Sequence, residues 1–128
     1  MFIHIPSHIK QKDRVLEYVS RLCKELKIHK LRKPEITIHF KSVLADDAWG
    51  YCHGDSTDIE IEINRTIPFE DQMQTLAHEM VHAKQFLRKE LNGNLWKKRN
   101  YDHREYEEQP WEKEANKLEE KLYKRCFI

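Results

Sequence analysis

The hydrophobic residues of this chain change their spacing twice along its 128 residues, and this limits the folds that it can adopt. Residues 10–27 and the segment after Pro68 carry apolar residues at the three- and four-residue spacing of amphipathic helices. Between them, residues 36–40 and 58–63 alternate apolar and polar side chains, which is the period of strands. A last helix should follow Pro110, because proline is favoured at the first helical position. The sequence therefore predicts an α+β fold, with a sheet of two to four strands packed against an N-terminal, a central and a C-terminal helix.

The predicted strand at residues 58–63 has an isoleucine face and an acidic face. Acidic side chains that point away from the core suit an edge strand, where charge discourages pairing with other chains. We therefore expect residues 58–63 to form an edge strand, with a further short strand around residues 49–53. An edge strand can bind an extended peptide by strand addition, and the acidic face would favour basic peptides.

The central predicted helix begins with Glu70 and Asp71, whose charges suit the positive end of a helix. Its apolar stripe continues to Leu91, and the following Asn-Gly-Asn at residues 92–94 is a helix-ending signal. We therefore expect this helix to end near residue 92. Residues 95–109 should be irregular or form a small hairpin.

Length and composition favour a single folded domain spanning residues 1–128. Three Trp, five Tyr and five Phe are too many for a disordered chain, and a formal net charge of +1 provides no basic surface for nucleic acid or an anionic membrane. The cysteines at 23, 52 and 126 form neither a disulfide framework nor a CxxC metal pair. The N-terminus also lacks the features of a secretory signal, so we expect a cytoplasmic protein.

The central helix carries the clearest chemical motif of the chain, His78-Glu79-Met80-Val81-His82. Two histidines four residues apart lie on one helical face, so their imidazoles can converge on one Zn²⁺. Glu79 is offset by one residue, where it can act as general base on a zinc-bound water without binding the metal. A chance match on a helix surface is the alternative, and it predicts no stoichiometric metal.

A catalytic zinc site of this kind needs a third protein ligand. Glu112 is the best candidate, because it shares one face of the last predicted helix with Asn116, four residues later. If that helix crosses the central one, Glu112 can reach the metal and Asn116 can orient a ligand histidine through its free ring N–H. Glu114, on another face, and His103, in the preceding loop, are the alternative ligands.

These motifs resemble those of a known family. The segment Ala77–Gln85, together with Trp96-Lys97-Lys98, Tyr106 and residues 110–115, is similar to the small metallopeptidases encoded by tailed phages and their hosts. The Glu-x-x-Ala-Asn pattern at 112–116 also resembles the ImmA/IrrE-type peptidases and other gluzincins. The resemblance covers about residues 75–120, and it departs from the family at Lys98, where the hairpin turn usually has glycine.

The resemblance implies a minimal zincin-like domain that hydrolyses peptide bonds with zinc, in the host cytoplasm if the chain is phage-encoded. It implies that His78, His82 and Glu112 bind the metal, that Glu79 is the general base, and that Asn116 supports a ligand. Hydrolysis also needs a donor that stabilises the developing oxyanion. Three residues of the loop between the ligands are candidates, with Tyr106 preferred to the other two, Tyr101 and His103.

Other functions stay open at this point. Cys52 would make the enzyme latent if its thiolate reached the metal, although an inert thiol is the simpler expectation. The chain could be a non-catalytic or latent zinc-binding regulatory module. It could also be a DNA-associated protease similar to the SprT/Spartan kind with His103 as ligand, which the near-neutral charge disfavours. We expect a peptide or protein as partner, and neither nucleic acid nor membrane.

Overall fold

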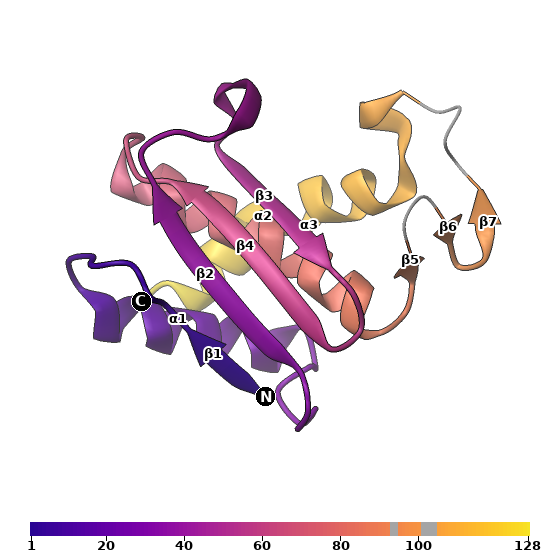
Figure 1. Cartoon of the computed structure of the whole chain (residues 1–128), viewed down its shortest axis with the longest axis horizontal. Coiled ribbons are helices and arrows are strands. Elements are labelled where there is room, and N and C mark those ends of the chain that lie inside the picture. Colours follow the sequence, from indigo (N-terminus) through magenta and orange to yellow (C-terminus); the bar gives the residue numbers. More distant parts are fainter. Residues whose placement is uncertain (93–94, 101–104) are drawn as a thin grey trace.

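The computed structural model describes residues 1–92, 95–100 and 105–128, and it confirms the α+β class (Figure 1). Within these residues the chain forms three helices, α1 (Lys12–Glu25), α2 (Phe69–Leu87) and α3 (Pro110–Cys126). The main sheet has four strands, β1 (Phe2–His4), β2 (Glu35–Lys41), β3 (Gly50–Gly54) and β4 (Asp58–Asn64). A second, smaller sheet contains β5 (Leu91–Asn92), β6 (Leu95–Trp96) and β7 (Arg99–Asn100). Two 3₁₀ turns are η1 (Ala45–Asp47) and η2 (Tyr106–Glu108).

The main sheet has the strand order β1-β2-β4-β3. The first three strands in this order are parallel, and β3 runs antiparallel to β4. The parallel pair β1 and β2 is joined through α1, as expected because a parallel connection needs a crossover. Strand β1 has no counterpart among the predicted strands, since three residues are too few to show a period.

The prediction that residues 58–63 form an edge strand is wrong, because β4 lies between β2 and β3. Its acidic residues find cross-strand partners on β2 instead of facing a free edge. Glu60 lies 2.6 Å from the His39 ring, and Glu62 lies 3.2 Å from the Lys41 amine. Paired charges on one sheet face are compatible with a central strand. The edge strand on this side of the sheet is β3.

The helices cover one face of the main sheet, and the isoleucine faces of β2 and β4 form the core beneath them (Figure 1). Tyr18 of α1 is buried in this core and donates a hydrogen bond of 2.8 Å to the Met73 carbonyl of α2. Cys23 of α1 is also buried in this core. Cys126 is buried as well, because the last turn of α3 packs onto the same core.

Helix α2 ends at Leu87, earlier than predicted, because a Schellman motif closes it. The amide of Lys89 donates to the Phe86 carbonyl, and the amide of Glu90 donates to the Gln85 carbonyl. Lys89 adopts the left-handed φ of 60° that this motif requires and that glycine normally provides. A lysine at that position carries no ending signal in the sequence, and Leu91 therefore begins β5 rather than continuing the helix. No helix in the described part of the chain is both long and apolar enough to cross a bilayer.

Candidate metal centre

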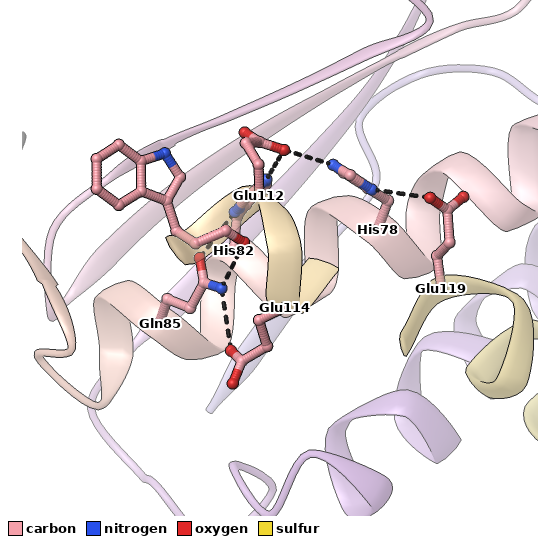
Figure 2. A network of polar contacts seen from close by, with 7 residues as sticks. His78, His82, Gln85, Glu112, Glu114 and Glu119 are labelled. Carbon is pink, nitrogen blue, oxygen red and sulfur yellow. Dashed lines mark hydrogen bonds and ion pairs between the residues drawn. The ribbon is translucent and has the colours of Figure 1, made fainter. Parts of the chain in front are cut away.

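The packing of α2 against α3 brings together the three residues predicted to hold a metal (Figure 2). His78 and His82 come from the middle of α2, and Glu112 comes from the first turn of α3. Glu112 Oε1 lies 3.0 Å from His78 Nε2 and 3.2 Å from His82 Nε2. Among the described residues, this is the one group of three that offers ligand atoms within 4.8 Å of one another.

These separations suit a small tetrahedral cation. Zinc bonds of roughly 2.0–2.1 Å at tetrahedral angles place neighbouring ligand atoms about 3.3 Å apart. The two measured distances from Glu112 are close to this value. His82 and Glu112 are each 6% exposed, so the group is also largely shielded from water.

The surroundings of His82 determine which of its ring nitrogens can face a metal. The Gln85 amide nitrogen donates to the Trp111 carbonyl and to Glu114 Oε1, both at 3.0 Å. Gln85 Oε1 must therefore face His82, where it accepts a 2.8 Å hydrogen bond from Nδ1–H. With the proton on Nδ1, the lone pair of a neutral His82 is on Nε2, which points toward Glu112. Glu114, the alternative ligand, instead lies 3.1 Å from the Lys84 amine.

His78 is oriented by a carboxylate, although not by the residue that we predicted. Its Nδ1–H donates to Glu119 Oε1 at 3.2 Å (Figure 2). Glu119 Oε2 also accepts a 3.3 Å hydrogen bond from the Gln74 amide nitrogen. Asn116, predicted for this role, is exposed on α3. In a helix, seven residues make nearly two full turns, so Glu119 lies closer to the direction of Glu112 than Asn116 does. The prediction for Asn116 is therefore wrong, and Glu119 lies at that place.

The charges of the cluster explain its suitability for a cation. Burial disfavours the Glu112 carboxylate, but hydrogen bonds with both histidines outweigh this and lower its pKa to about 2. Burial likewise opposes a charged His78, yet hydrogen bonds to Glu112 and Glu119 raise its pKa to about 10. The pKa of His82 is raised for the same reason. Three converging acceptor atoms need positive charge, which either protons or a divalent metal ion can supply.

Glu79 lies beside this cluster and takes no part in it. It is 6% exposed, and burial raises its pKa to about 7, more than the nearby histidines lower it. Strand β3 covers Glu79 at Gly50, where a Cβ atom would lie 3.1 Å from Glu79 Oε2 and 2.6 Å from the Thr75 methyl. Glycine at position 50 therefore lets β3 approach α2 closely enough to cover the carboxylate.

A cleft of about 390 Å³ opens in front of the cluster, between β3 and the start of α3. Glu79, His82, Glu112 and Tyr106 all line it, so the predicted base and the predicted oxyanion donor face one space. Tyr106 is 63% exposed, on the turn η2. Partial burial of its hydroxyl, together with the charge of Glu112 and a hydrogen bond to it, raises the pKa of Tyr106 and keeps it protonated. The other candidate donors, Tyr101 and His103, lie outside the described residues.

Cys52 also lines this cleft, on the covering strand β3. Burial and the charges of Glu79 and Glu112 raise the pKa of the thiol well above its usual value. These surroundings favour the neutral thiol, in agreement with the expectation of an inert cysteine.

We expect Glu119→Gln to weaken zinc binding about 10- to 100-fold, because the amide is a poorer acceptor for the His78 N–H than the carboxylate. The measurement is a zinc competition titration against a chromophoric chelator. Asn116→Ala is the matched control on the same helix, and its affinity should equal that of the wild type. Equal zinc affinities for the wild type and Glu119→Gln would contradict the orienting role.

Sequence reasoning missed Gln85, Gln74 and Glu119, the residues that contact the histidine Nδ1 atoms or support those contacts. Their spacing from the histidines and from Glu112 along the helices could have indicated these residues. Gln85 follows His82 by three residues, Gln74 precedes His78 by four, and Glu119 follows Glu112 by seven.

Comparison with protein-family models, with curated proteins and with solved structures found no match to this chain.

Proposed function

We propose that this protein is a zinc-dependent peptidase of the gluzincin type that acts on peptides or proteins in the cytoplasm. The observation that carries this proposal is the convergence of His78 Nε2, His82 Nε2 and Glu112 Oε1 beside an unengaged, buried Glu79. When bound by these three residues, zinc would act as a Lewis acid and would lower the pKa of water.

Glu79 supplies the proton transfers that peptide hydrolysis needs. Its pKa of about 7 lets it accept a proton from the attacking water and later deliver it to the leaving amine at neutral pH. Tyr106 keeps its phenolic proton and can donate a hydrogen bond to the oxygen that gains charge in the transition state. Gln85 and Glu119 hold the two imidazoles in the tautomer that directs Nε2 inward.

Strand β3 is the expected docking site for the substrate backbone. Within the described part of the chain it pairs only with β4, and its residues from Gly50 to Cys52 line the cleft. An extended peptide can therefore add to β3 as a further strand and cross in front of Glu79. Glu60 and Glu62 of β4 pair with His39 and Lys41 of β2, so we do not base a preference for basic peptides on them.

The direct test is digestion of a proteome-derived peptide mixture by the zinc-loaded protein, followed by mass spectrometry of new termini. We expect cleavage that a chelator removes and that added zinc restores. A protein that binds one zinc per chain and yet cleaves nothing would instead support the non-catalytic zinc module.

A further inference from the structure

The cleft at the metal cluster continues along β3 toward Gly54 through two further hollows. The first, of about 210 Å³, shares Cys52 and His82 with the cleft. The second, of about 480 Å³, shares Phe86 and Leu91 with the first and reaches Gly54. Because Phe86 follows His82 by one helical turn, this outer groove begins one turn away from a predicted ligand.

The outer groove combines an apolar floor with a basic rim. Phe86, Leu91 and Leu95 line it, and Leu95 remains 41% exposed. Lys89 and Lys98 line it as well, and both are exposed without an acidic partner among the described residues. The apolar floor can contact an apolar side chain of a ligand, and the lysines of the rim can pair with a neighbouring negative charge.

Asp55 is the one acidic residue among the described residues of this lining, and its carboxylate is engaged in a local turn. Asp55 Oδ1 accepts hydrogen bonds from the Thr57 amide, the Thr57 hydroxyl and the Asp58 amide. These bonds lower the pKa of Asp55 and hold its carboxylate in a local turn. Among its described residues, the groove therefore presents the unpaired ammonium groups of Lys89 and Lys98, whereas the Asp55 carboxylate is hydrogen-bonded within its own turn.

Two tight turns bring the two lysines to this groove. Lys89 has φ of 60°, and Lys98 has φ of 73° in the turn between β6 and β7. This left-handed conformation is strained for lysine and unstrained for glycine. The Schellman motif requires it at Lys89, and the tight turn between β6 and β7 has it at both Lys97 and Lys98. Here both strained residues place their side chains along the same groove.

We propose that the outer groove selects substrates with an acidic residue next to an apolar one, a few positions from the scissile bond. This inference rests on the proposed function and names the substrate class for it. Antiparallel pairing with β3 is the more stable mode, and it places the selected segment on the N-terminal side of the bond. Each strand residue advances roughly 3.3 Å, so the acidic residue should lie about two to four positions from the cleavage point.

The test compares Lys98→Gly with Lys97→Gly, two variants of the same turn. Both remove one positive charge, and both relieve a left-handed φ, which is 49° at Lys97. Only Lys98 lines the groove, whereas the Lys97 amine lies 5.3 Å from the centre of the Trp96 ring. We expect Lys98→Gly to reduce the preference for acidic peptides about two- to fivefold and Lys97→Gly to leave it unchanged. The double variant Lys89→Glu/Lys98→Glu should prefer basic peptides.

Two readouts separate this inference from the proposed function. Cleavage-site profiling gives the preference, and fluorescence anisotropy with zinc-loaded Glu79→Gln gives the affinity for paired peptides with Glu or Gln at the selected position. If the wild type cleaves peptides without preferring acidic residues, or if both glycine variants lose that preference equally, the groove assignment is overturned. The proposed peptidase activity is then unaffected. If nothing is cleaved, the proposed function fails, and equal binding of the paired peptides overturns the groove assignment as well.

Discussion

Replacing Glu112 with alanine is expected to remove stoichiometric zinc, from one ion per chain in the wild type to none after dialysis. The loss of zinc affinity should exceed the roughly 10- to 100-fold weakening expected when a residue that hydrogen-bonds to a metal ligand is removed. The reason is geometric, because Glu112 Oε1 lies within 3.2 Å of both histidine Nε2 atoms and no other described carboxylate joins them. Elemental analysis of the purified proteins measures the effect.

Two further variants make this result specific. Glu120→Ala removes an exposed carboxylate from the same helix, and it should retain one zinc per chain. His103→Ala addresses the alternative third ligand of a SprT-like site, and it should also retain zinc. Zinc that persists in Glu112→Ala and disappears in His103→Ala would overturn the gluzincin assignment, and a wild type without metal would overturn the zinc site altogether.

Glu79→Gln is expected to keep zinc and to lose about 10²- to 10⁴-fold in turnover, because a carboxamide cannot accept the proton of the attacking water. The measurement is turnover of the best peptide from the cleavage screen, beside zinc content. Glu70→Gln, on the exposed first turn of the same helix, is the matched control and should be fully active. Unchanged turnover in Glu79→Gln would contradict its role as general base.

The thermal stability of Glu79→Gln distinguishes loss of the general base from misfolding as the cause of lower turnover. The pKa of Glu79 is raised to about 7 in the folded protein, so folding disfavours its charged form above that pH. A neutral glutamine lacks this penalty. The Tm of Glu79→Gln at pH 8 should therefore equal or exceed that of the wild type, and a lower value would point to misfolding instead.

The strands and helices that carry the site could be predicted because their periodicity is local. Alternation in residues 36–40 and 58–63, and helical spacing around His78, each depend on a few neighbouring residues. The grouping of His78, His82 and Glu112 followed from the same rule, since two histidines one turn apart need only a partner helix. Glu112 was identified by its place on a helical face, and α3 does direct that face toward His78.

Other features depend on contacts that spacing does not encode. Whether β4 lies at an edge depends on where β3 pairs, and the charges of β4 fit a central position because β2 supplies partners. Asn116 and Glu119 both lie near the direction of Glu112, and the crossing of α2 and α3 decides between them. The end of α2 depends on Lys89 accepting a left-handed φ, which its residue type does not favour.

The span between His82 and Glu112 also has a consequence for the stability of the folded chain. A metal ion held by both residues would close a loop of 30 residues, which contains the whole segment from β5 to η2. Because the unfolded chain does not hold these two side chains together, such an ion would bind the folded state in preference and stabilise it by about 2.7 kcal/mol at a free concentration of about 100 times its Kd. The ion would then serve as a reversible cross-link between α2 and α3 in a small domain, and its removal by a chelator should lower the Tm.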